Sequence, residues 1–233
     1  MDSGISRRRF RLGWSAACLI GLPVFATAAE DAPAPMDHAH HHMEGMGSPE
    51  ASPPAADPHA AHRHMMANND IKRSLVAYSV PRLKLVRDDG TAVALDKEID
   101  DGRPVVLNFI YTTCTTICPL TSQVFSVLQQ KLGADRGKVH LVSISIDPEQ
   151  DTPERLRAYA ARFHAAADWQ HYTGTASASV AAQQAFGVYR GDKMNHAPVT
   201  LLRAAPGAEW IRLDGFATAD DLLAEIHMLT ASR

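Results

Sequence analysis

The stretch Pro104–Leu120, PVVLNFIYTTCTTICPL, contains the pattern that decides the fold. Its first part, Pro104–Tyr111, is a continuous apolar run of β-forming side chains, which is typical of a central strand buried on both faces. Cys114 and Cys118 follow in a short polar loop, and Pro119 suits the first turn of a helix. The stretch therefore predicts a buried strand, a cysteine-bearing loop and a helix.

The rest of the chain alternates between strand and helix patterns on both sides of this stretch. Before it, Pro81–Leu95 forms two alternating runs around an Asp-Asp-Gly turn, which is the signal of a β-hairpin. After it, Thr152, Pro153 and Glu154 form the cap of an amphipathic helix. The later elements are expected as a helix ending at Gly133, a strand at Lys138–Asp147, the capped helix to about His164, a strand near Trp169–Tyr172, a helix near Val180–Phe186, strands at Val199–Leu202 and Glu209–Gly215, and a terminal helix at Ala217–Arg233. This order predicts an α/β fold: a central mixed sheet flanked by helices, with an N-terminal β-hairpin extension.

The first 28 residues differ from the rest of the chain in charge. They hold four arginines, Arg7, Arg8, Arg9 and Arg11, and one acid. The remainder holds 19 basic and 25 acidic residues, which is a formal charge of −6 with neutral histidines. This balance argues against nucleic acid, or an anionic membrane, as the partner of the mature protein.

Residues 1–28 have the pattern of an export signal. A basic run, a modest apolar run and the small-residue site Ala26-Thr27-Ala28 are the parts of a secretory leader. Ser6–Phe10 is similar to a twin-arginine signal, whose pathway carries folded cargo. We therefore expect an exported, periplasmic protein. An uncleaved leader that anchors the chain to the inner membrane is the alternative, although its apolar run is short for a span of about 20 apolar residues.

Residues 29–70 have the composition of a disordered linker. They are rich in Ala, Pro, His and Met, and cannot bury enough apolar surface to offset the entropy of ordering. Seven of the twelve histidines and five methionines fall here: His38, His40, His41, His42, His59, His62, His64, Met36, Met43, Met46, Met65 and Met66. Imidazole and thioether groups are copper ligands, so the segment is expected to capture copper or other metal ions weakly. A solvated linker without a metal role is the alternative.

Cys114 and Cys118 are better suited to chemistry than to stapling the fold. A bridge between them would close a very short loop and constrain little of the unfolded chain. The start of a helix favours the thiolate form of a cysteine, which is both a nucleophile and a metal ligand. The pair is therefore a candidate redox centre and a candidate metal site.

A distant histidine favours the metal interpretation. His196 lies in Tyr189–Leu202, YRGDKMNHAPVTLL, on a loop before an apolar strand. In a thioredoxin-like arrangement this loop lies beside the start of the cysteine-bearing helix, so the imidazole would reach both sulfurs. Two thiolates and an imidazole form a soft ligand set that suits Cu(I), and Cu(II) with one further ligand.

Three motifs occur in a diagnostic order: YTTCTTICP at 111–119, SIDPEQDTPERLRAY at 145–159 and FGVYRGDKMNHAPVTLL at 186–202. Together they resemble the Sco/SenC family, the copper proteins of cytochrome c oxidase assembly, over residues 71–233. The resemblance implies a thioredoxin-like domain in which Cys114, Cys118 and His196 bind one copper ion. It also implies that Asp147 and Asp151 lie near the site, where they order its loop or receive a partner.

Two functions remain open. In the first, the chain is a metallochaperone that delivers copper to cytochrome c oxidase subunit II, or to another copper-site protein, and deals with other periplasmic thiol proteins or copper carriers. In the second, it is a thiol–disulfide oxidoreductase of the thioredoxin or peroxiredoxin type, in which Cys114 attacks a partner disulfide and Cys118 resolves the mixed species. Asn195 and Pro198, which flank His196, leave room for the second function, and enzymatic activity stays an open question.

Other polar residues have simpler interpretations. Asp147, which precedes a proline, fits common turn chemistry, and Asp151 is placed to cap the following helix. The remaining histidines are expected to be structural: His140, His164, His171 and His227.

Overall fold

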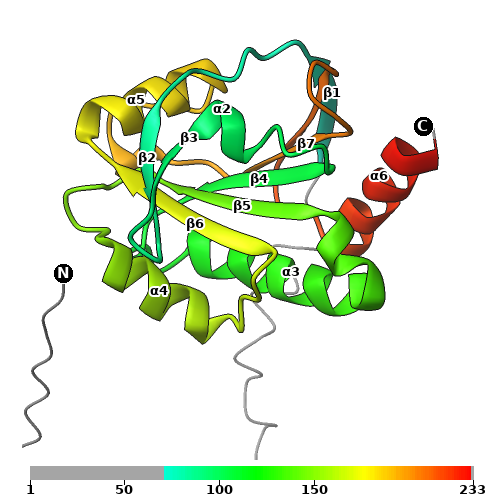
Figure 1. Cartoon of the computed structure of the whole chain (residues 1–233), viewed down its shortest axis with the longest axis horizontal. Coiled ribbons are helices and arrows are strands. Elements are labelled where there is room, and N and C mark those ends of the chain that lie inside the picture. Colours follow the sequence, from blue (N-terminus) through cyan, green and yellow to red (C-terminus); the bar gives the residue numbers. More distant parts are fainter. Residues whose placement is uncertain (1–70, 232–233) are drawn as a thin grey trace, which may run out of the picture. The chain divides into compact units, whose positions relative to one another are not determined.

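The computed structural model describes residues 71–231, which form an eight-stranded sheet with helices on both faces (Figure 1). The strands are β1 (Lys72–Val76), β2 (Lys84–Arg87), β3 (Ala92–Ala94), β4 (Val105–Ile110), β5 (His140–Ser145), β6 (Trp169–Gly174), β7 (Val199–Arg203) and β8 (Trp210–Asp214). Their order across the sheet is β1-β8-β7-β4-β5-β6-β2-β3. The predicted α/β class is confirmed.

The sheet is mixed because its central strands are parallel and its outer strands are antiparallel. β4 pairs in parallel with β5, and β5 pairs in parallel with β6. On one side, β7, β8 and β1 follow in antiparallel order. On the other side, the predicted hairpin of β2 and β3 joins the same sheet, because β2 pairs with β6.

Two hydrophobic cores cover the two faces of the sheet. The helices are α2 (Leu95–Glu98), α3 (Ile117–Leu132), α4 (Pro153–Arg162), α5 (Ala176–Ala185) and α6 (Ala219–Ala231), with 3-10 turns η1 (Gly133–Lys138) and η2 (Lys193–Asn195). Successive side chains of β4 point to opposite faces. Val106 and Ile110 join the core under α3, α4 and α6, whereas Val105, Leu107 and Phe109 join the core with α2 and α5.

Local sequence explains where the helices begin and end. The Thr152 hydroxyl accepts a hydrogen bond from the Arg155 backbone N–H at 3.3 Å and caps α4, as predicted. α3 ends before Gly133, whose φ of 54° favours glycine. α5 begins earlier than predicted because the Thr175 hydroxyl accepts from the Ala178 backbone N–H at 3.1 Å.

Two elements were not expected from the sequence. β1 pairs with β8, from Lys72 opposite Asp214 to Val76 opposite Trp210. Its sequence, KRSLV, is short and strongly charged, so its strand conformation depends on a partner far along the chain. α2 is a single turn between β3 and β4, too short to leave a periodic pattern.

Several predictions concern residues outside the described range. The export signal at 1–28 and the His/Met-rich segment at 29–70 lie there, so both stay predictions, as does the domain boundary between 70 and 71. Within residues 71–231, no helix combines the length and the apolarity that a membrane span requires.

Candidate functional site

The two cysteines lie where β4 passes into α3. Cys114 is in the connecting loop and Cys118 is in the first turn of α3, as predicted. Both are free cysteines; Cys118 is fully buried and Cys114 is 7% exposed. The Cys118 backbone N–H points at the Cys114 sulfur at 3.4 Å, and the Tyr111 backbone N–H points at the Cys118 sulfur at 3.4 Å. A backbone N–H just after β4 and another in the first turn of α3 therefore face the two sulfurs.

The two sulfurs differ in protonation. The Cys118 thiol donates a hydrogen bond to the Cys114 sulfur, and this bond is the main reason that the pKa of Cys114 lies well below its usual value, despite partial burial. The backbone N–H groups of Cys118 and Thr116 and the Tyr111 hydroxyl act in the same direction. The shared bond and burial raise the pKa of Cys118. At neutral pH the pair is therefore one thiolate, Cys114, and one thiol, Cys118.

Asp151 orders the loop that carries Cys114. Its carboxylate is fully buried and accepts hydrogen bonds from the Thr112 backbone N–H at 3.1 Å, the Thr112 hydroxyl at 2.5 Å and the Ser145 hydroxyl at 2.6 Å. The prediction that Asp151 caps the following helix is wrong, because Thr152 has that role. The carboxylate instead fixes the cysteine loop to the end of β5, as the family resemblance implied.

His196 lies at the same end of β4 as the cysteines. It follows η2, is 8% exposed, and its Nε2 atom is 3.0 Å from the carbonyl oxygen of Phe109. A carbonyl can only accept, so Nε2 carries the proton. Burial lowers the pKa of His196, against the opposing effects of this hydrogen bond and of the nearby Cys114 thiolate. The ring is therefore neutral, and the lone pair of Nδ1 remains for a metal.

The structure brings the two sulfurs together but does not complete a three-ligand site. Among residues 71–231, no group of three His, Cys, Asp or Glu side chains is already arranged to hold a metal ion. The donor set nevertheless fits a soft ion, because it combines a thiolate, a neighbouring thiol and a neutral imidazole with a fixed tautomer. His196 must move toward the sulfurs for all three to bind one ion.

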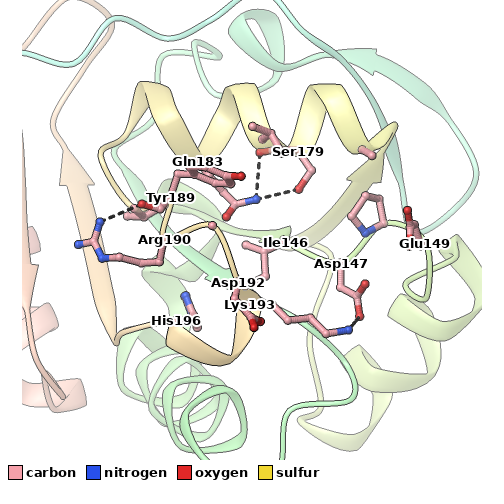
Figure 2. Close-up of a pocket in the computed structure, with 15 residues that line it drawn as sticks. Ile146, Asp147, Glu149, Ser179, Gln183, Tyr189, Arg190, Asp192, Lys193 and His196 are labelled. Carbon is pink, nitrogen blue, oxygen red and sulfur yellow. Dashed lines mark hydrogen bonds and ion pairs between the residues drawn. The ribbon is translucent and has the colours of Figure 1, made fainter.

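A pocket of about 460 Å³ opens beside His196 (Figure 2). Its walls come from the loop after β5, from α5 and from residues 188–193. Figure 2 shows the Lys193 ammonium reaching the Asp147 carboxylate, at 2.5 Å, and this ion pair ties η2 to the loop after β5. Asp147 therefore holds the segment that leads to His196, in addition to its place in a turn.

Sequence reasoning missed Tyr111 and Lys193. Burial is the main cause that raises the pKa of Tyr111 to about 12, and the neighbouring Cys114 sulfur acts in the same direction. The Lys193 ammonium lies 5.7 Å from the centre of the Tyr111 ring. Tyr111 stands inside the cysteine motif, which was the available signal. Nothing local marks Lys193, because its partner Asp147 lies far away along the chain.

The remaining histidines lie outside this site. His140 and His171 are buried on β5 and β6, and His140 Nε2 is 2.9 Å from the side-chain oxygen of Gln170. His164 follows α4 with a φ of 55°, and His227 is exposed on α6. These positions agree with the structural roles expected for them.

Residues 76–231 match the sequence model of the SCO1/SenC family, and this range includes both cysteines and His196. The chain belongs to this family. The resemblance carried by the three sequence motifs is therefore confirmed.

The similarity to characterised members of the family covers only part of each protein. The chain is 34% identical over 104 residues to the SCO1 protein homolog of Bacillus subtilis (strain 168), which is 44% of this chain and 53% of that protein. It is 36% identical over 81 residues to Protein SCO1 homolog 1, mitochondrial, of Arabidopsis thaliana, which is 34% of this chain and 24% of that protein. The chain thus matches about half of these relatives' length, or less.

Solved structures of the family have the same fold. BsSco has a TM-score of 0.58 and 28% identity, covering 69% of this chain and 98% of that one. ScoI of Arabidopsis thaliana has a TM-score of 0.56 and 24% identity, covering 66% of this chain and 100% of that one. These similarities confirm the thioredoxin-like fold expected from the sequence.

Proposed function

We propose that this chain is a copper metallochaperone that binds one copper ion through Cys114, Cys118 and His196. One observation carries the proposal: a thiolate–thiol pair and a neutral imidazole, with its Nε2 proton held by the Phe109 carbonyl, lie at the same end of β4. Soft sulfur ligands and imidazole suit Cu(I) better than they suit hard cations.

The family supports copper as the cargo. ScoI of Arabidopsis thaliana and ScoI of Bradyrhizobium japonicum have been solved with copper bound. BsSco is described as a member of the Sco family of cytochrome c oxidase assembly proteins, and as having a disulfide switch. For this chain we accordingly propose cytochrome c oxidase subunit II, or another copper-site protein, as the recipient.

The residues of the site would act in a defined order. The Cys114 thiolate is ready to bind the ion, whereas Cys118 must first lose its proton. Asp151 keeps the cysteine loop in place while the segment held by Lys193 and Asp147 brings His196 closer. Release would follow by ligand exchange, as thiolates of the recipient replace these ligands one at a time. Oxidation of the two cysteines to a disulfide would remove both sulfur ligands and stop binding.

The proposed place of action is the periplasm. The twin-arginine-like pattern of residues 1–28 supports export, either with cleavage or with an uncleaved leader as an inner-membrane anchor. The acidic charge of the remaining chain supports protein partners, such as copper carriers and thiol proteins, rather than nucleic acid. The His/Met-rich segment would supply weaker copper sites.

A second function is favoured by the unequal protonation of the cysteines. A low-pKa thiolate beside a buried thiol is the arrangement of a dithiol reductase. Cys114 would attack a partner disulfide, and the departing partner thiolate would take up a proton. Cys118, once deprotonated, would then attack Cys114 and release the second partner thiol. This activity is compatible with the first, since reducing a copper-site disulfide prepares it for loading.

Titration of the reduced protein with Cu(I) against a competing chelator tests the proposal. We expect one tight Cu(I) per chain, lost in Cys114→Ser and Cys118→Ser, and a loss of about tenfold or more in affinity in His196→Ala. The control is His227→Ala, which removes an exposed histidine on α6 and should leave the affinity unchanged. The full chain is expected to hold additional weak copper that a chain beginning at Asp70 lacks.

Absence of tight binding, or an unchanged affinity in His196→Ala, would contradict the three-ligand site. The dithiol function would then be preferred, and the reduction potential of the cysteine pair in glutathione buffers would be the quantity to measure.

A further inference from the structure

Met194 is unusually exposed for an apolar side chain. It lies in η2, two residues before His196, and 73% of its surface is exposed, more than for any other large hydrophobic residue within 71–231. Cys114, by comparison, is 7% exposed. The Met194 thioether is therefore far more accessible to a copper donor in solution than either cysteine sulfur.

A single hydroxyl group connects this thioether to the site. The Tyr111 hydroxyl lies 3.9 Å from the Met194 sulfur and points its O–H at it. The same hydroxyl lies near enough to the Cys114 sulfur to lower the pKa of that cysteine. Because a hydroxyl has one proton, it donates to one sulfur at a time. The Met194 thioether and the Cys114 sulfur are thus both close to the Tyr111 hydroxyl.

We propose that Met194 is the receiving ligand for Cu(I), which binds the incoming ion first and passes it to Cys114. This inference rests on the proposed copper function and extends it to the route by which the ion enters. A thioether is soft enough to bind Cu(I), and as a neutral donor it gives the ion up to a thiolate. A permanent ligand would instead be buried with the other donors.

The charges around Met194 allow a cation to approach. Lys193 is the neighbouring basic residue, and its ammonium is paired with Asp147 at 2.5 Å. The Arg190 guanidinium donates to the carbonyl oxygens of Gly187 and Tyr189. The ion pair offsets the positive charge closest to the thioether, so the repulsion on Cu(I) is reduced.

The transfer is a pair of ligand exchanges without a redox change. The bond from the donor ligand to Cu(I) breaks as a lone pair of the Met194 sulfur forms a new bond. The Cys114 thiolate then binds the ion as the Met194 bond breaks. Any proton on the Cys114 sulfur leaves to solvent as that sulfur binds the ion, and the oxidation state of copper does not change.

The test is the rate at which the reduced full chain takes Cu(I) from its bicinchoninate complex in a stopped-flow experiment. We expect Met194→Leu to take up Cu(I) about tenfold more slowly, while its equilibrium affinity stays within about threefold. Met194→His restores a ligand and should keep the rate within about threefold of the parent chain. Met228→Leu, which changes another exposed methionine on α6, should behave as the parent.

The outcomes separate this inference from the proposed function. If the parent chain binds no Cu(I) tightly, the proposed copper site itself is contradicted. A parent that binds normally, with equal uptake rates in Met194→Leu, would overturn only the receiving role. A Met194→His chain as slow as Met194→Leu would assign the effect to the conformation of η2 instead of to a ligand. Equal losses of rate and affinity would make Met194 a permanent ligand, which also contradicts the inference.

Discussion

At the scale of single residues, the thiolate of Cys114 depends on its neighbour more than on any other group. The thiol of Cys118 donates to it from the first turn of α3, and this bond contributes more than the backbone donors or the Tyr111 hydroxyl. The reactivity of one cysteine is therefore governed by the side chain of the other.

Replacing Cys118 by alanine is expected to raise the pKa of Cys114. The side-chain donor is lost, while the opposing effect of burial remains. At a pH below the pKa of a thiol, each unit by which that pKa rises lowers the thiolate fraction about tenfold. Alkylation of Cys114 by iodoacetamide at mildly acidic pH should therefore slow by about the same factor. The measurement is the alkylation rate as a function of pH.

Cys118→Ser is the matched control, because its hydroxyl can still donate to the Cys114 sulfur. We expect its pH profile to lie between those of the parent chain and of Cys118→Ala. Coinciding profiles for Cys118→Ala and the parent chain would show that the backbone donors alone maintain the thiolate.

Residues that act through short-range patterns were predictable, and those that act through distant contacts were not. Cys114, Cys118 and His196 stand in recognisable motifs, so the sequence could single them out as a candidate site. The family resemblance implied that Asp151 orders the loop, but its local sequence suggested a helix cap, because the Thr112 amide that donates to it comes near only on folding. The same holds for Lys193, whose partner comes from another loop.

At the scale of elements, the hairpin is fitted closely to the edge of the central sheet. Gly174 at the end of β6 lies opposite Leu85 of β2, and a Cβ atom at this glycine would come within 2.9 Å of the Leu85 side chain. Leu85 is fully buried, so it has little room to move aside. The absence of a side chain at Gly174 allows the hairpin to pack there.

Gly174→Ala is expected to destabilise the protein by about 1–3 kcal/mol through overpacking at this contact. Gly137→Ala is the matched control, since a Cβ atom at Gly137 meets nothing within 4 Å. Urea unfolding of both variants measures the difference. Equal stability of the two variants would show that Leu85 and β2 shift at little cost.

Elements with their own start signals were predicted, whereas elements defined by a partner were not. α4 begins at a Thr-Pro pair and β4 is a continuous apolar run, so each is recognisable from a few residues. β1 carries two basic residues in five, and its strand conformation follows from pairing with β8. The sequence of β1 alone therefore did not identify it as a strand.

At the scale of the whole molecule, the core contains a histidine whose charged form it does not accommodate. His171 is fully buried, packed against the rings of Tyr159 and Trp169. The acidic group that faces it is Asp88, whose carboxylate oxygen is 4.0 Å from Nδ1. Burial dominates and lowers the pKa of His171 to about 3.

The stability of the protein should therefore fall in mild acid. The folded pKa of His171 is below its unfolded value of about 6.5, so protonation favours the unfolded chain. The contribution of His171 to the free energy of unfolding is fully present above about pH 6.5. It is lost as the pH falls toward 3, at about 1.4 kcal/mol for each pH unit. We expect His171 to lower the free energy of unfolding by about 2 kcal/mol between pH 7 and pH 5. Burial of His140 lowers its pKa and acts in the same direction.

Denaturant unfolding at both pH values, in the parent chain and in His171→Gln, measures this dependence. The variant should be less stable overall but should lose less stability on acidification. His227→Gln, at an exposed position on α6, serves as the control and should keep the dependence of the parent chain. An unchanged dependence in His171→Gln would assign the acid sensitivity to other groups.

The unequal protonation of the two cysteines has a consequence for how a partner would recognise the loaded protein. With Cys114 as thiolate, Cys118 as thiol and His196 neutral, the empty site carries one negative charge. If Cu(I) binds through these three residues as proposed, one proton leaves Cys118 and one positive charge is added, so the net charge of the site would be the same before and after loading. A recipient could not distinguish the two forms by long-range electrostatic attraction. It would have to detect the shape of the segment that carries His196.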